Sequence, residues 1–176
     1  ITAEIRGLEN SYVLRTSPTE LEAFYLDKAH IEPLVLHTED FYIEDQKSTS
    51  VDARHDPNRF FFPGDKPYHI PGTQLTVAIP FDGDANLWKI RASTYSLSGF
   101  PEIELRENLV LFRHKFADDA AHPEKLRQEI DRKVDSLRQA VNKLRNNVDN
   151  HNSTAPGVVK SEIERKRQQA KSASGA

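Results

Sequence analysis

Two aspartates and an asparagine at alternate positions form the pattern in this sequence that comes nearest to a metal site. Asp82, Asp84 and Asn86 are spaced like the first oxygen ligands of a calcium-binding loop. The pattern then fails, because Leu87 stands where the loop needs glycine and Ser93 where it needs a bidentate glutamate. We interpret the run as a polar turn and keep a weak metal site at these three residues as a hypothesis.

Carboxylates near strand ends raise the question of a metal-dependent nuclease. Such a site needs an acidic residue at a strand end and an acidic-x-Lys motif on the next strand, to hold a divalent ion and position water. Asp82 and Asp84 could serve as the first part, but residues 87–91 carry no carboxylate. Glu102 and Glu104 have no Lys two residues later. A metal-dependent hydrolase around Asp82 and Asp84 is therefore only our second alternative.

The seven histidines lack the spacing of a metal or catalytic motif. No two are four residues apart, and no HExxH sequence occurs. His37 with Asp40, and His55 with Asp52 and Asp56, are neighbours typical of ordinary turns. The chain also has no GxSxG elbow and no glycine-rich phosphate loop. We predict no catalytic residue and no cofactor, and we favour a chain that is not itself an enzyme.

Two groups of basic residues could contact nucleic-acid phosphates. One group stands near aromatic side chains in the middle of the chain, and the other follows in the C-terminal tail: Arg54, Arg59 and Lys66; Lys160, Arg165, Lys166 and Arg167. The segment 122–176 is net basic and the rest net acidic, although the whole chain carries a net charge of −3. The tail lacks aromatic residues for base stacking. A nucleic-acid-binding module that uses the basic helical tail is our first alternative function.

Composition restricts the class of protein. The 176 residues contain no Cys, which excludes disulfides, thiolate zinc sites and cysteine nucleophiles. No apolar run is long enough to cross a bilayer, so we expect a soluble, cytoplasmic protein that does not enter a membrane. The chain has no Met and begins at Ile1, and we interpret it as a piece of a longer protein.

The N-terminal third predicts a helix followed by extended chain. Ser17 as N-cap and Pro18 and Glu20 behind it predict a helix that ends near His30. A weaker pattern predicts helix within residues 1–15. Apolar residues then predict short strands at 34–36, at 41–43 and around residue 51, with a turn in the polar stretch 44–50 and another at 56–59.

The best strand pattern lies at Gln74 to Phe81, where apolar residues alternate with others. Pro80 lacks the N–H that a ladder needs, which places the strand at an edge or ends it there. A further strand should begin at Leu87. The alternation in 102–116 predicts a hairpin, with strands at 102–105 and 109–116 and a turn between them.

The C-terminal part predicts one long amphipathic helix at residues 123–150. Its apolar residues repeat at steps of three and four, as in a coiled coil: Leu126, Ile130, Val134, Leu137, Val141, Leu144 and Val148. Asparagines at 146–152 should end it, and Pro156 should open a second helix, which makes a helical hairpin. The seam must pack on the sheet or, in a homodimer, on a second copy.

We therefore predict an α+β fold: an N-terminal helix, an antiparallel sheet of about five strands and a C-terminal long-helix hairpin. The expected divisions are an α+β domain at 1–121, the helical hairpin at 122–172 and a disordered tail at 173–176.

Several short motifs resemble a known group of proteins. They are Asp56-Pro57-Asn58-Arg59, Pro71-Gly72-Thr73, Ile79-Pro80-Phe81-Asp82-Gly83-Asp84, Leu87-Trp88, Ser93-Thr94, Asn150 and Asn152, and Ile163-Glu164-Arg165-Lys166-Arg167. Over about residues 20–170 the chain is similar to the N-terminal region of uncharacterised bacterial proteins that carry a downstream restriction-endonuclease-like nuclease domain. The resemblance implies an accessory module, with the nuclease motifs beyond Ala176.

Together these observations favour a non-catalytic interaction or regulatory module. We expect it to be the N-terminal part of a larger bacterial protein, such as a defence nuclease. The expected partner is another protein or a downstream domain of the same polypeptide.

Overall fold

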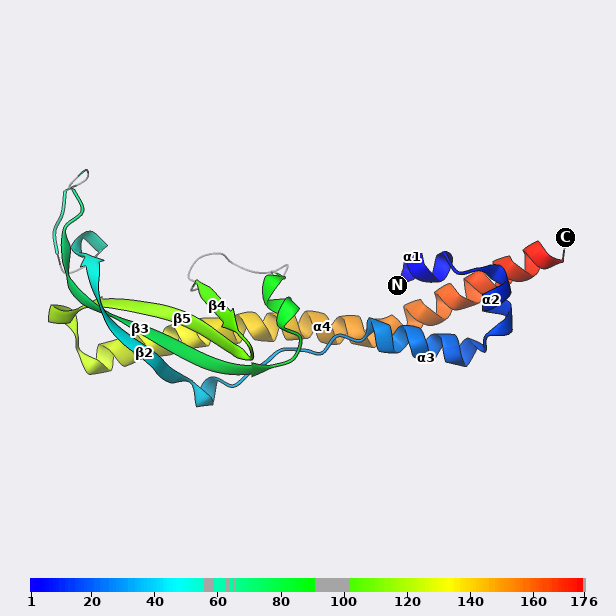
Figure 1. The fold of residues 1–176 in the computed structure, drawn as a ribbon, viewed down its shortest axis with the longest axis horizontal. Coiled ribbons are helices and arrows are strands. Elements are labelled where there is room, and N and C mark those ends of the chain that lie inside the picture. Colours follow the sequence, from blue (N-terminus) through cyan, green and yellow to red (C-terminus); the bar gives the residue numbers. More distant parts are fainter. Residues whose placement is uncertain (56–58, 63, 65, 91–101, 176) are drawn as a thin grey trace. The chain divides into compact units, whose positions relative to one another are not determined.

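The fold is described by a computed structural model at residues 1–55, 59–62, 64, 66–90 and 102–175. It is α+β, as the sequence predicts, with short N-terminal helices, an antiparallel sheet and a long C-terminal helix (Figure 1). The chain divides into two compact units, residues 1–33 with 145–176 and residues 34–144. This division differs from the boundary that we predicted between residues 121 and 122, because the last helix contributes to both units.

The first unit contains three short helices and the end of a long one. They are α1 (Thr2–Arg6), α2 (Asn10–Arg15), α3 (Pro18–Ala29) and the C-terminal part of α4 (Pro123–Ser174). Helix α3 has Ser17 at its N-cap and His30 at its C-cap, which confirms the predicted bounds. The core consists of apolar side chains from α1, α3 and α4: Ile5, Leu21, Tyr25, Val159 and Ile163.

The second unit is built on a curled antiparallel sheet. Its strands are β1 (Val35–Leu36), β2 (Tyr42–Asp52), β3 (His69–Asp82), β4 (Ile103–Arg106) and β5 (Leu109–Ala117). Strand β3 is central: it pairs with β1 and β2 along one side and with β5 along the other, and β5 pairs with β4. Val77 and Ile79 in β3 are fully buried, as predicted, but Gln74, Thr76 and Ala78 on the opposite face of the strand are buried as well, so the burial does not alternate.

Two strand predictions are confirmed and one is corrected. The hairpin of β4 and β5 turns at Glu107, whose φ of 51° is left-handed. Strand β3 ends two residues after Pro80, as expected, but the alternative that it lies at an edge is wrong. Pro80 is tolerated there because its carbonyl still accepts from the His37 amide at 2.9 Å, while its missing donor falls near the strand end.

Two other predictions are wrong. The polar stretch 44–50 is not a turn but the middle of β2, because pairing with β3 supplies backbone hydrogen bonds all along it. Leu87 does not begin a strand: residues Ala85–Lys89 form a 3₁₀ helix, which buries Leu87 and places the Trp88 ring edge-on against Phe81 at 5.6 Å. The predicted turn at 56–59 lies mostly outside the described residues.

Helix α4 is continuous from Pro123 to Ser174, so the predicted helical hairpin is wrong. The helix also runs through residues 173 and 174, where we expected a disordered tail. The apolar seam is buried within the chain, as its spacing requires: Ile130, Val134, Leu137, Val141, Leu144 and Val148. In the second unit, α4 lies along one face of the sheet (Figure 1). The sheet thus covers the seam in the second unit.

Candidate functional site

The calcium-like run forms a turn whose side chains serve separate contacts. Gly83 has a φ of 101°, which only glycine adopts easily. Asp84 Oδ1 accepts from the backbone N of Asn86 at 2.9 Å and from its Nδ2 at 3.0 Å, and so caps the 3₁₀ helix. Asp82 instead bonds His37 Nε2 at 2.8 Å. This arrangement suits a polar turn, and the metal site at Asp82, Asp84 and Asn86 stays a hypothesis that the geometry does not favour.

Among the described side chains of the candidate histidines, that of His37 lies close to carboxylates. Besides the bond to Asp82, its Nδ1 lies 3.9 Å from Glu39 Oε1. The hydrogen bond to Asp82 raises the pKa of His37, and the negative charges of Glu39 and Asp40 act in the same direction. Within the described residues, only His37, Glu39 and Asp40 bring three such ligand atoms within 4.8 Å of one another. Exposed clusters of acidic residues are common in proteins that bind no ion there, so this cluster by itself does not define a metal centre.

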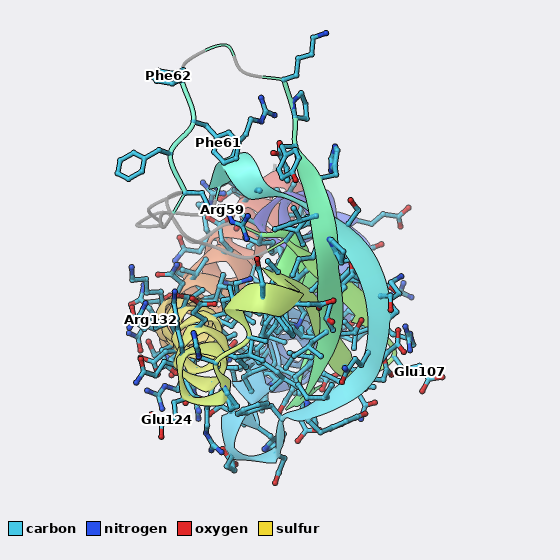
Figure 2. All side chains as sticks on the ribbon, turned by 90° about the vertical axis from the view of Figure 1, so that its left-hand side faces the viewer. Arg59, Phe61, Phe62, Glu107, Glu124 and Arg132 are labelled. Atoms are coloured by element: carbon cyan, nitrogen blue, oxygen red, sulfur yellow. The ribbon has the colours of Figure 1, made fainter. Side chains whose placement is uncertain are left out.

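The basic residues of the β2–β3 connection are largely occupied by carboxylates. Arg54 binds Asp52 with its Nε and Nη2, and this lowers the pKa of Asp52 strongly. Arg59 pairs with Asp119. Lys66 is exposed. Phe62, labelled in Figure 2 beyond the end of the sheet, is 82% exposed. The predicted phosphate contacts would have to displace two ion pairs. The predicted acid–base neighbours His55 and Asp56 have side chains outside the described part of the structure.

The basic tail is also partly structural. Arg167 donates to the backbone carbonyls of Val13 and Thr16, the latter at 2.8 Å, and so closes the end of α2. Arg165 binds Glu162 at 2.6 Å, and the same glutamate accepts two hydrogen bonds from Arg6. Lys160 is exposed and Lys166 half-buried. The tail therefore holds α1 and α2 in the first unit more than it forms a positive surface.

A buried polar cluster between β5 and α4 was not foreseen. His114, 7% exposed, has its Nδ1 3.0 Å from Lys133 Nζ. An ammonium can only donate, so Nδ1 carries the lone pair and the imidazole proton sits on Nε2. That nitrogen lies 3.2 Å from Glu129 Oε2, without the alignment of a hydrogen bond. Burial and the Lys133 charge lower the pKa of His114, and burial lowers that of Lys133.

Strand β2 is an accessible part of the second unit. It is 11 residues long and mostly exposed, and within the described residues its only ladder partner is β3. Every second residue of such an edge strand turns its N–H and C=O groups away from the sheet. Tyr42 and Ile43 at its start are 45% and 44% exposed.

A shallow groove of about 480 Å³ lies between the start of β2 and the first turns of α4. Its lining comes from the segment before and at the start of β2, from β3 and from α4: Glu39, Phe41, Tyr42, Ile43, Leu75, Pro123, Leu126, Arg127 and Ile130. The volume is within the range of ligand sites in proteins. The sequence signal for this site was Phe41-Tyr42-Ile43. We predicted a short strand at these residues but not their exposure. Because we predicted a turn at 44–50, we did not foresee one long edge strand from Tyr42 to Asp52.

Comparisons with known protein families, characterised proteins and solved structures give no match to this chain. Within the described residues, no helix combines the length and apolarity that crossing a bilayer requires.

Proposed function

We propose that the chain is a non-catalytic interaction module, and that it binds an extended segment of a partner protein along strand β2. The observation that carries the proposal is the long open edge of β2 beside an apolar groove. An extended peptide can add to such an edge, because its backbone completes the ladder while its side chains enter the neighbouring pockets. This mode needs no catalytic residue and no cofactor.

The alternative functions have less support. Nucleic-acid binding needs free cations, whereas Arg54, Arg59, Arg165 and Arg167 are engaged in ion pairs or bind backbone carbonyls. If it nevertheless occurs, affinity for DNA or RNA will fall steeply with salt. A metal-dependent hydrolase would show an increase in melting temperature with calcium or magnesium, and the separate contacts of Asp82 and Asp84 do not lead us to expect one.

The wider setting follows from the resemblance to bacterial nuclease-associated regions. We propose that the module is the N-terminal regulatory part of a larger bacterial protein, such as a defence nuclease, and that its ligand is a downstream domain or a separate protein. Sequencing of the complete reading frame tests this setting. An open reading frame without a downstream nuclease domain would remove the nuclease part of the proposal but not the interaction module.

Binding along β2 can be tested by selection of peptides from a phage-displayed octapeptide library, followed by amide hydrogen exchange. We expect the selected peptides to slow exchange in β2. Adjacent residues point their N–H groups in opposite directions, so Ser48→Pro and Thr49→Pro are both made. One of them removes an outward donor and leaves the ladder with β3 intact, and this variant should fold and lose the peptide. The other removes a ladder donor. Peptides that bind both variants equally, or that protect only other elements, would refute the proposal.

A further inference from the structure

The groove beside β2 has an apolar floor and a partly exposed apolar wall. Leu75 and Ile130 form the floor, both 6% exposed. Ile43, whose ladder partner Val77 lies on the same face of the sheet as Leu75, forms the strand side of the groove and is 44% exposed, whereas the Tyr42 side chain belongs to the opposite face. Water in contact with so much apolar surface is unfavourable, and its displacement by an apolar side chain is the main free energy that such a groove offers.

The size of the groove limits how much of a ligand it can hold. The α4 residues that line it, Pro123 to Ile130, span about 10 Å at 1.5 Å per residue, which matches about three residues of an extended strand. Side chains of a strand alternate between its two faces. Only those on the face of Leu75 point toward α4, so the groove receives one or two apolar side chains, and the residues between them point away.

The strand side of the groove is acidic, whereas the α4 side contributes Arg127, whose Nε lies 3.8 Å from Asp131 Oδ2. Glu39, Asp40 and Asp45 flank Phe41 to Ile43 along the chain. Glu39 and Asp40 stand beside the His37 imidazole, and Asp45 has no cationic partner in the described part of the chain. Glu44 is already paired with Arg106 at 2.9 Å. A ligand with Lys or Arg between its apolar residues would find carboxylates here, whereas an acidic ligand would be repelled.

Two features restrict which strands can add to this edge. A bulge interrupts the β2–β3 register between Ile43 and Asp45, and Lys47 follows in the strand. Bulges and charges on edge strands discourage indiscriminate pairing. A ligand must therefore provide complementary side chains in addition to a free backbone.

From this geometry and charge we propose that the groove selects an extended segment in which apolar residues alternate with basic ones. The inference rests on the proposed function and specifies its ligand class. The ligand adds as a strand to β2, one or two of its apolar side chains cover Leu75 and Ile130, and its cations lie near Asp40 and Asp45.

The test compares three acetylated, fluorescein-labelled octapeptides on the full chain: alternating Val-Lys, alternating Val-Glu and alternating Ser-Lys. Fluorescence anisotropy gives the affinities and amide exchange gives the location. We expect Val-Lys to bind about ten-fold or more tightly than either other peptide, since it alone has both apolar burial and the correct charge. It should also slow exchange in β2.

Matched variants separate the groove from the general surface. Ile43→Ser should weaken Val-Lys binding about five-fold, while Ile90→Ser, which changes an isoleucine that is 56% exposed and outside the groove, should not. The double change Glu39→Gln with Asp40→Asn should reduce the preference for Val-Lys over Val-Glu. Glu22→Gln with Asp27→Asn, in α3, is its control. Circular dichroism verifies that each variant is folded.

The outcomes distinguish this inference from the function on which it rests. Equal affinity for Val-Lys and Val-Glu with slowed exchange in β2 would overturn the charge selection and leave strand addition standing. Equal affinity for Val-Lys and Ser-Lys would overturn the proposal that apolar side chains of the ligand bind in the groove. Failure of all three peptides, together with failure of the library selection, would overturn both proposals.

Discussion

The side-chain amide of Asn152 binds both backbone groups of Ile31. Its Nδ2 donates to the Ile31 carbonyl at 2.8 Å, and its Oδ1 accepts from the Ile31 N–H at 3.1 Å. One residue earlier, His151 Nε2 lies 2.9 Å from the Ala29 carbonyl, and because a carbonyl only accepts, that nitrogen must carry the proton. Two side chains of α4 thus satisfy the backbone just where α3 ends.

Replacement of Asn152 tests this contact. Asn152→Ala leaves the partly buried N–H and C=O of Ile31 without partners, and should lower the free energy of unfolding by about 1–3 kcal/mol. Urea unfolding followed by circular dichroism at 222 nm measures it. Asn147→Ala, at an exposed position of the same helix, should be neutral or slightly stabilising. Equal effects of the two changes would mean that the Asn152 contact contributes nothing.

Pro156 offers a test of whether α4 is continuous. Inside a helix, Pro removes one hydrogen bond and crowds the preceding turn. Pro156→Ala should therefore raise the free energy of unfolding, by up to about 3 kcal/mol. If a second helix began here, as the sequence suggests, Pro would be favourable at its first position, and the same change would be neutral or destabilising.

The neighbouring glycine calibrates that measurement. A Cβ added at Gly157 meets no atom within 4 Å, so Gly157→Ala should stabilise by about 1 kcal/mol through helix propensity alone. A gain for Gly157→Ala without one for Pro156→Ala would contradict an uninterrupted helix at Pro156.

Arg167 should matter for stability and not for phosphate binding. Arg167→Ala removes a charged donor from the carbonyls of Val13 and Thr16 and should cost about 1–3 kcal/mol in chemical unfolding. Lys166→Ala should change stability by less than about 0.5 kcal/mol. If both variants have wild-type stability and both lose affinity for DNA at low salt, the structural role of Arg167 is wrong.

His114 should make the second unit less stable in mild acid. Its folded pKa lies below the unfolded value of about 6.5, so the unfolded chain takes up the proton first as the pH falls. The stabilising effect is complete above pH 6.5 and is lost as the pH falls from there through the folded pKa. His37, with a raised pKa, contributes in the opposite direction. His114→Gln keeps an acceptor for Lys133 and should reduce the loss of stability between pH 7.5 and 5.5.

The control for this measurement is His122→Gln, at an exposed position. Its profile should follow that of the unaltered chain, and NMR titration of the imidazoles should place the pKa of His114 below that of His37. A His114→Gln profile that coincides with the unaltered one would show that burial does not shift this histidine.

Where the local preferences of the chain agree with the tertiary environment, the sequence alone is sufficient to predict the secondary-structure element. The capping signal at Ser17 and Pro18 predicts α3, and the alternation in 74–81 and 102–116 predicts β3 and the β4–β5 hairpin, because short-range sterics and the burial of apolar residues determine those elements. The alternation does not predict that β3 is buried on both faces from Gln74 to Ile79. The seam at 130–148 likewise predicts burial before its covering is known.

Tertiary structure decided the rest. Residues 44–50 are polar enough to be a turn, yet pairing with β3 makes them a strand, and so creates the open edge on which our functional proposal rests. Asparagines at 146–152 have weak helix propensity, but the bonds of Asn152 to Ile31 compensate. In both cases the partner is far away in sequence, at separations of up to 121 residues. Local preferences of a few tenths of a kcal/mol per residue (about 0.2–0.7) cannot outweigh such hydrogen bonds.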